Sequence, residues 1–230
     1  MRGIILAGGH GTRLRPATKA MNKHMVPILN KPMILYPLET LKTLGVEDIM
    51  IVTGGNHVGA FADFLGDGSE YGVSLTYRVQ KDAGGIAQAL ALGERFAAGD
   101  KLAVILGDNV FDNETLSFIQ TNDETCTIYV KEVEDPERFG VYYGTHIEEK
   151  PTNPASNLAV VGLYIYPSDV FDVVKTLKPS NRGELEITDV NNFYLKDGRF
   201  VILKVDGFWS DAGTPESMHT VTDWAYSNNK

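Results

Sequence analysis

A glycine-rich segment near the N-terminus carries residues of the kinds that bind phosphate. Residues 6–16 read LAGGHGTRLRP and follow an apolar run. Glycines let the backbone approach a ligand closely and adopt positive φ, so consecutive amides can point at phosphate oxygens. Arg13 adds a planar guanidinium fork that suits phosphate. A tight turn between a strand and a helix would use the same glycines, so this segment alone leaves both interpretations open.

Two common phosphate-binding motifs do not fit this segment. The P-loop requires a Lys followed by Ser or Thr after its last glycine, and no such pair follows here. The dinucleotide motif GxGxxG is matched by Gly9 and Gly11, but Leu14 occupies its third glycine position. The sequence therefore argues against both a P-loop and a nicotinamide-dependent oxidoreductase.

Two aspartates could hold a divalent cation. Asp108 follows the apolar residues 102–106, and ligands of open parallel sheets bind beyond the carboxyl ends of such strands. Asp211 follows Phe208 and Trp209 and precedes a Gly-Thr turn. Two carboxylates together with nucleotide phosphates suit Mg²⁺, which takes few ligands from protein. Either aspartate alone is equally typical of a turn or helix cap, so their pairing needs other evidence.

The elements that would position these residues alternate between strands and helices in the first half of the chain. Apolar, β-branched runs predict strands over 2–7, 48–53, 74–79 and 101–106, and helical patterns cover 33–44, 58–65 and 85–96. Pro37 leaves the start of the helix over 33–44 open. Continuous apolar strands separated by helices predict an α/β fold with an open, doubly wound and mostly parallel sheet, as in Rossmann-like proteins.

The second half of the chain is more mixed. Strands are predicted over 125–130, 141–143, 159–166 and 200–205, and helices over 169–177 and 187–195. No repeat or linker divides the chain. We therefore expect one domain over 1–230, with a first half over about 1–110 and a more mixed second half over about 111–230.

Composition narrows the classes of function. The chain has 230 residues, of which 43% are hydrophobic, and a formal net charge of -9. Nucleic-acid binding is not expected, because proteins that follow a phosphate backbone usually carry a basic surface. The single cysteine, Cys126, excludes an internal disulfide. No segment is long and apolar enough to cross a membrane or to form a signal peptide, so we expect a cytoplasmic protein.

A longer string around the glycines identifies the phosphate loop. The string over 8–33 resembles the signature of the sugar-1-phosphate nucleotidylyltransferases, and within that family it is most similar to the short form of the glucose-1-phosphate thymidylyltransferases. Further matching segments lie at 64–68, 77–80, 85–89, 106–109, 135–141, 148–151, 182–189 and 209–214. The positions of the first string that match are Gly8, Gly9, Gly11, Thr12, Arg13, Leu14, Pro16, Thr18, Lys23, Pro27, Lys31, Pro32 and Met33.

The resemblance implies a reaction and roles for individual residues. A nucleotidyl group would pass from dTTP to glucose 1-phosphate by direct displacement with Mg²⁺, and the chain would form a homo-oligomer, a dimer or tetramer. The implied catalytic residues are Arg13, Lys23 and Asp108, and the implied metal ligands are Asp108 and Asp211. The residues implied to bind nucleotide are Gly8, Gly9, Gly11, Thr12, Arg13, Gln80 and Gly85, and those implied to bind the sugar phosphate are Gly140, Glu149, Lys150 and Val161.

Alternatives stay open at this point. UTP or another sugar phosphate would use the same glycine loop, and a catalytically inactive nucleotide-sugar sensor would keep the fold. The chain departs from the longer enzymes at His24, where they usually carry Gln, and at Gly84, where they usually carry Asp. The histidines are scattered without metal-ligand spacing, so none is assigned a catalytic role: His10, His24, His57, His146 and His219.

Overall fold

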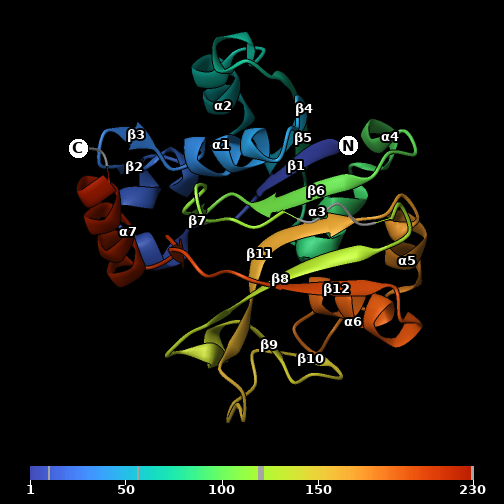
Figure 1. Cartoon of the computed structure of the whole chain (residues 1–230). Helices are drawn as coiled ribbons and strands as arrows, with labels where there is room; N and C mark the ends of the chain where they lie inside the picture. Colours follow the sequence, from blue (N-terminus) through green and yellow to red (C-terminus); the bar gives the residue numbers. More distant parts are fainter. Residues whose placement is uncertain (10, 56, 119–121, 229–230) are drawn as a thin grey trace.

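One large mixed sheet forms the centre of the molecule (Figure 1). The computed structural model describes residues 1–9, 11–55, 57–118 and 122–228. His10, for which the sequence predicts no role, lies outside the described residues. The nine-stranded sheet has the order β10-β9-β11-β6-β1-β4-β5, and β8 adds β12 beside β11. The predicted α/β fold with a mostly parallel sheet is confirmed.

Four parallel strands make up the N-terminal part of the sheet: β1 (Arg2–Ala7), β4 (Asp48–Gly54), β5 (Ser74–Gln80) and β6 (Leu102–Leu106). β1 pairs with β4 on one side and with β6 on the other. The side chains of β1 alternate between the faces, so Ile4 and Ile5 enter two different hydrophobic clusters. Because both faces are covered, β1, β4 and β6 are apolar along almost their whole length.

Helices cover the two faces of the sheet. Residues of α1 (Leu35–Thr43) and α2 (Val58–Leu65) pack into the cluster that contains Ile5. Residues of α3 (Ile86–Ala91), α4 (Glu94–Ala97), α5 (Val170–Thr176) and α6 (Ile187–Asp197) pack into the cluster that contains Ile4. No described helix is long and apolar enough to cross a membrane.

Two predicted helices differ from the observed ones. The helix expected over 33–44 begins at Leu35, which places Pro37 in the first turn, where a missing N–H breaks no helical hydrogen bond. The helix expected over 85–96 is two helices, α3 and α4, separated at Leu92 and Gly93. A Cβ on Gly93 would lie 2.5 Å from Ile4 Cδ1, so the break lies where the backbone packs closely on β1.

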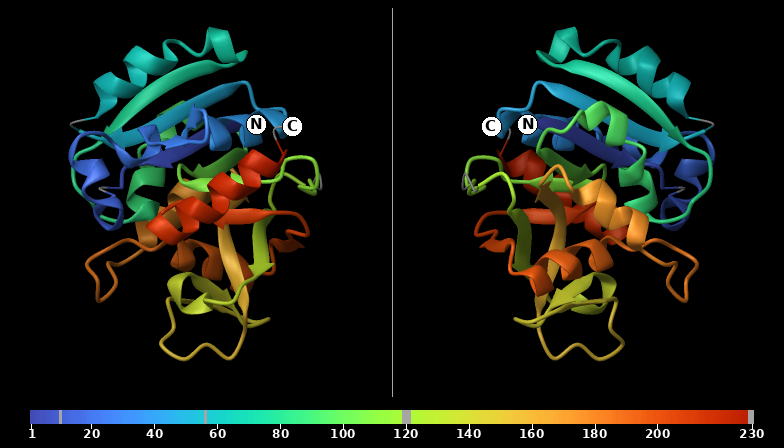
Figure 2. Two further views of the ribbon diagram at one scale, coloured as in Figure 1. Left: turned by 90° about the vertical axis from the view of Figure 1, so that its left-hand side faces the viewer. Right: turned by 90° about the vertical axis from the view of Figure 1, so that its right-hand side faces the viewer.

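The second half of the chain extends the same sheet. β11 (Leu158–Tyr166) runs antiparallel to β6, and β8 (Cys126–Glu132) pairs with both β11 and β12 (Phe200–Lys204). A short hairpin of β9 (Gly140–Tyr142) and β10 (Ile147–Glu149) projects from this end of the molecule (Figures 1 and 2). Both hydrophobic clusters contain residues from the two halves, so the halves share their packing.

Several short elements were not predicted from the sequence. β7 (Asn109–Phe111) pairs antiparallel with β13 (Trp209–Asp211), and the chain continues into α7 (Pro215–Asn228), on the opposite side of the molecule from α5 (Figure 1). A third ladder joins β2 (Pro27–Ile28) to β3 (Lys31–Pro32). Asp211 is the register partner of Asn109, so the β7–β13 ladder brings residues about a hundred positions apart to one end of β6.

We predict that Gly93→Ala lowers the free energy of unfolding by about 1–3 kcal/mol, because the added methyl group overpacks the contact with Ile4 and Met50. Gly59→Ala in α2 is the matched control, since a Cβ there meets nothing within 4 Å. The control should raise the free energy of unfolding by about 0.4–1 kcal/mol. Urea denaturation of the two variants measures both effects, and equal stabilities would contradict the packing argument.

Candidate active site

The glycine loop folds around the side chain of Lys23. Gly11 has a φ of 60°, in the left-handed region that favours glycine, and is followed by a 3-10 turn over Thr12–Leu14. A Cβ on Gly11 would lie 2.8 Å from Lys23 Cβ, and one on Gly9 would lie 3.6 Å from Lys23 Nζ. The loop therefore needs glycine at position 11, whereas a Cβ at position 9 would lie at ordinary contact distance from the lysine.

Lys23 forms an ion pair with Asp108 at the carboxyl end of β6. Only 15% of the lysine side chain and 16% of the aspartate side chain are exposed. Burial by itself would raise the pKa of Asp108, but the Lys23 ammonium and hydrogen bonds from Lys23 and Asn109 lower it to about 2. The carboxylate is therefore ionised at neutral pH and is held at a fixed position.

Asp211 lies across from Asp108. Asp211 Oδ2 is 2.7 Å, and Asp108 Oδ2 3.4 Å, from the position that a Cβ on Gly213 would occupy. Burial and the nearby negative charge of Asp108 raise the pKa of Asp211, and Arg138 partly offsets this with hydrogen bonds of 2.9 Å to both carboxylate oxygens. The structure thus brings together the two aspartates that the sequence could not pair.

The two carboxylates fit a divalent cation that takes its other ligands from phosphate. Each presents oxygen, the ligand that hard cations such as Mg²⁺ prefer. No cluster of three or more His, Cys, Asp or Glu side chains with metal-binding geometry occurs among the described residues. A cation here would therefore depend on substrate oxygens to complete its coordination shell, as is usual for Mg²⁺ at nucleotide sites.

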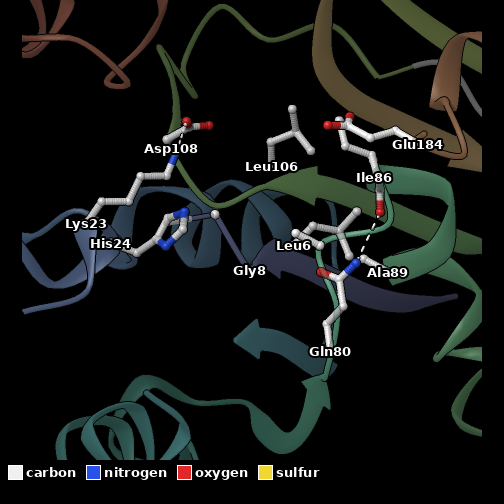
Figure 3. Close-up of a pocket in the computed structure, with 13 residues that line it drawn as sticks. Leu6, Gly8, Lys23, His24, Gln80, Ile86, Ala89, Leu106, Asp108 and Glu184 are labelled. Atoms are coloured by element: carbon white, nitrogen blue, oxygen red, sulfur yellow. Dashed lines mark hydrogen bonds and ion pairs between the residues drawn. The ribbon is translucent and has the colours of Figure 1, made fainter. Parts of the chain in front are cut away.

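A cavity of about 250 Å³ opens between the glycine loop and the start of α3 (Figure 3). Its apolar side includes Leu6, Ile86, Ala89 and Leu106, and can pack against a flat ring. The polar residues that line it are Gly8, Gly9, Lys23, His24, Gln80, Gly85, Asp108 and Glu184.

Gln80 lies at the end of this cavity away from Asp108 (Figure 3), and Gly85 also lines the cavity. Gln80 is the last residue of β5, and its Nε2 donates to the Gly85 carbonyl oxygen at 3.2 Å. Gly85 has a φ of 101°, and a Cβ there would lie 2.4 Å from the Leu185 carbonyl oxygen, so no other residue fits. Gln80 and Gly85, which are predicted to bind the nucleotide base, therefore lie side by side.

A second cavity of about 180 Å³ meets the first at Leu106 and Asp108. It collects positive charge around the two carboxylates, because Arg13, Arg138 and Lys150 all line it. Asp211, Val160, Gly162 and Trp209 complete most of the wall. Two anionic groups, one in each cavity, would meet beside Asp108, where cations are available to neutralise them.

Glu149 lies at the base of the β9–β10 hairpin beside Gly140 and Lys150, two of the other residues predicted to bind the sugar phosphate. Thr188 Oγ1 donates to Glu149 Oε2 at 2.5 Å, and the Lys150 and Arg182 side chains lie 3.5 Å from Glu149 Oε1. A Cβ on Gly140 would lie 3.5 Å from Glu149 Oε2. The carboxylate is oriented from three sides and keeps its capacity to accept hydrogen bonds from hydroxyl groups.

The side chain of Val161, which is predicted to bind the sugar phosphate, does not face the second cavity. Its side chain is fully buried in the hydrophobic cluster that contains Ile5, on the face of the sheet away from the cavity. Its neighbours Val160 and Gly162 line the cavity instead. Side chains alternate along a strand, so a shift of one residue along β11 exchanges the two faces.

Three residues of the site had no role in the sequence prediction. Arg138 binds Asp211, and Trp209 lines the second cavity. Asn109 donates to Asp108 Oδ1 at 3.0 Å, and its own oxygen accepts from the Trp209 indole at 2.7 Å and from the Gly162 amide at 3.0 Å. Arg138, Trp209 and Asn109 lie in segments that match the family. Their residue types and their spacing in the sequence do not indicate that they contact one another's partners.

His24, which was set aside in the sequence, also lines the first cavity. It is almost fully buried, and its ring packs 6.4 Å from Phe61. Its Nδ1 lies 2.7 Å from Asn22 Oδ1, which also accepts from the His24 backbone amide. Burial, with a smaller contribution from Lys23, lowers the pKa of His24 to about 3, so the ring is neutral and donates from Nδ1.

Comparison with known proteins agrees with this geometry. A family model described as nucleotidyl transferase matches residues 2–226. The chain belongs to the nucleotidyl transferase family. A glucose-1-phosphate thymidylyltransferase of Neisseria meningitidis is 44% identical over 233 residues, which cover 95% of this chain and 80% of that protein. The enzyme of the same name from Mycobacterium tuberculosis is 40% identical, with 97% and 82% covered.

Solved structures give the same family for this nucleotidyl transferase. A structure from Bacillus anthracis, named as a glucose-1-phosphate thymidylyltransferase in complex with sucrose, has a TM-score of 0.90 and 47% identity, covering 100% of this chain and 97% of that chain. A UDP-glucose pyrophosphorylase in complex with UDP-glucose has a TM-score of 0.84 and 26% identity, covering 99% of each chain. The resemblance inferred from the glycine-rich string is confirmed.

We predict that burial of neutral His24 makes the nucleotidyl transferase less stable in acid. The unfolded chain takes up a proton near pH 6.5 and the folded chain only near pH 3, so stability is lost as pH falls below 6.5. Between pH 7.5 and pH 5 this group should account for about 2 kcal/mol of lost unfolding free energy. His24→Gln should remove that part of the loss in urea denaturation at the two pH values.

His219→Gln is the control for this experiment, because 77% of the His219 side chain is exposed. Its pH dependence should equal that of the wild type. If His24→Gln and wild type lose the same unfolding free energy on acidification, the buried neutral state of His24 is wrong.

Proposed function

We propose that this chain catalyses transfer of a thymidylyl group from dTTP to glucose 1-phosphate. A phosphate oxygen of the sugar phosphate attacks the α-phosphorus of dTTP. The bond between that phosphorus and the oxygen bridging to the β-phosphate breaks. dTDP-glucose forms and pyrophosphate leaves with the electron pair of the broken bond. Because the sugar phosphate attacks directly, no covalent enzyme intermediate is required.

One observation carries this proposal: two cavities meet at Asp108. The first pairs the residues suited to a base, Gln80 and Gly85, with the glycine loop and Lys23. The second holds Arg13, Arg138 and Lys150 close to Asp211. A nucleotide in the first cavity and a sugar phosphate in the second would bring their phosphates together at the point where the two cavities join.

Each group of residues then has a part in the displacement. The amides of Gly8, Gly9, Gly11 and Thr12 with the Arg13 side chain would bind the nucleotide phosphates, and Lys23 would stabilise charge that develops at the α-phosphoryl group. Arg138 and Lys150 would hold the sugar phosphate in line for attack, while Glu149 accepts hydrogen bonds from sugar hydroxyls. Positioning and charge neutralisation of this kind account for most of the catalysis in phosphoryl transfer.

Asp108 and Asp211 are proposed to hold Mg²⁺. When bound there, the ion would supply charge neutralisation at the phosphates and orient the leaving pyrophosphate. The ion also explains why two carboxylates are kept close together in a partly buried site, where their mutual repulsion raises the pKa of Asp211.

The main alternative is the same reaction with UTP. The UDP-glucose pyrophosphorylase structure supports it through its fold, at 26% identity. The thymidylyltransferases support dTTP more strongly, because they are 40–44% identical to this chain over nearly its whole length. We further propose, from the family resemblance, a homo-oligomer that acts in the cytoplasm.

Pyrophosphate release tests the proposal. The chain is incubated with Mg²⁺ and glucose 1-phosphate, and dTTP, UTP, ATP, CTP and GTP are compared. The highest kcat/KM is expected with dTTP. A higher value with UTP would replace the assignment by a uridylyltransferase, and no release with any nucleotide would contradict the proposed reaction.

We predict that Asp108→Asn and Asp211→Asn each lower kcat by about 100-fold or more, because the site loses charge that holds the cation against the reacting phosphates. Asp206→Asn, an exposed aspartate five positions before Asp211, is the matched control and should retain wild-type kcat. Near-normal Mg²⁺-dependent turnover in both active-site variants would refute the assignment of these carboxylates to the cation.

A further inference from the structure

The orientation of the Gln80 side-chain amide is fixed by its neighbours. An amide oxygen and nitrogen have nearly the same size, so hydrogen-bond partners decide which is which. The Gly84 backbone N–H can only donate, and it lies 3.1 Å from Gln88 Oε1. That contact sets the Gln88 oxygen as an acceptor. The Gln80 atom 2.9 Å from the same oxygen must therefore be the nitrogen, Nε2.

A second partner leads to the same orientation. Gln80 Nε2 lies 3.2 Å from the Gly85 carbonyl oxygen, which can only accept. Both amide hydrogens of Gln80 are thus directed away from the glycine loop. Its oxygen is turned to the side of Gly8 (Figure 3), 2.6 Å from the position of a Cβ on that glycine. No donor among the described residues is bonded to it, so Gln80 presents an acceptor to the cavity.

We propose that Gln88 is a positioning residue that determines base specificity by holding Gln80 with its oxygen toward the ligand. The inference rests on the proposed function, because it takes the cavity at Gly8 and Gly85 to be the site of the nucleotide base. Gln88 does not contact the base in this proposal and acts through Gln80. The ligand class that it selects is a nucleotide whose base carries an N–H at the edge facing Gln80.

Base chemistry explains the selection. The imide N3 of thymine and uracil carries a hydrogen and donates to the Gln80 oxygen. The N3 of cytosine has a lone pair instead, so the two acceptors repel each other and both stay without a partner. A glutamine free to rotate its amide by 180° would accommodate either base. Sites that hydrogen-bond a substrate in one orientation reject an analogue that cannot pair, because a buried polar group is then left unpaired.

Gly84 provides the space for this arrangement. A Cβ on Gly84 would lie 2.2 Å from Gln88 Nε2 and 2.7 Å from its Oε1, so a side chain at position 84 would displace the Gln88 amide. The backbone N–H of Gly84 and the absence of its side chain therefore act together.

The test compares dTTP with dCTP in the wild type and in Gln88→Leu and Gln88→Glu. The readout is the ratio of the two kcat/KM values, together with the ratio of the dissociation constants from calorimetry. Gln88→Leu has no acceptor, so the preference for dTTP should fall about tenfold. Gln88→Glu keeps the acceptor for Gly84 and Gln80 and should retain the preference.

Each outcome decides the proposal. Loss of preference in Gln88→Leu with rescue in Gln88→Glu supports it, since a general packing defect would not depend on an acceptor. An unchanged ratio in Gln88→Leu, or an equal loss in Gln88→Glu, overturns it.

The binding constants separate this inference from the proposed reaction. A wild type that releases no pyrophosphate, but binds dTTP in preference to dCTP and loses that preference in Gln88→Leu, keeps the role of Gln88. The proposed reaction alone then fails. A wild type that binds the two nucleotides equally overturns the role of Gln88, whatever its turnover.

Discussion

The proximity of two carboxylates in a partly buried site is the constraint on which the rest of the structure depends. Asp108 and Asp211 repel each other, and burial adds to the cost of keeping both ionised. The chain offsets this cost with one cation for each: Lys23 for Asp108 and Arg138 for Asp211. Removal of either partner would leave a buried charge uncompensated.

Much of the local architecture follows from placing those four charges. The glycine loop has no side chain at Gly9 or Gly11, so Lys23 can reach Asp108 beneath it. The β7–β13 ladder brings Asp211 to the end of β6. Asn109 holds Asp108 in place relative to β11 and Trp209. Its side-chain oxygen accepts hydrogen bonds from β11 and Trp209, and its nitrogen donates to Asp108. A buried asparagine whose hydrogen bonds are met in this way gives rigidity without a further charge.

The topology of the sheet places these charged residues between two cavities that could each hold a ligand. The parallel strands β1, β5 and β6 end at the same edge of the sheet. Gln80 is the last residue of β5, and Gly8 and Asp108 come just after the ends of β1 and β6. β11 runs antiparallel beside β6 and supplies Val160 and Gly162 to the neighbouring cavity. The two cavities therefore share a wall that contains Asp108, and a single carboxylate faces both.

The sequence by itself determined the parallel half of the sheet, the glycine loop and the family. β1, β4 and β6 are apolar along most of their length because both faces are buried, and the loop glycines are required locally by backbone conformation and close contact. The string over 8–33 implied the roles of Arg13 and Lys23 by resemblance, and the further matching segments implied those of Asp108 and most other site residues. The family is confirmed.

Only the tertiary structure decided which side chains meet. The ladder between Asn109 and Asp211 joins segments too short to show a strand pattern, so no sequence pattern pairs the two aspartates. The break between α3 and α4 follows from packing against Ile4, and the side of β11 that faces the cavity, Val160 and not Val161, depends on strand register. Arg138 and His24 contact residues of distant segments, Asp211 and Phe61, and hydrophobic periodicity does not encode such contacts.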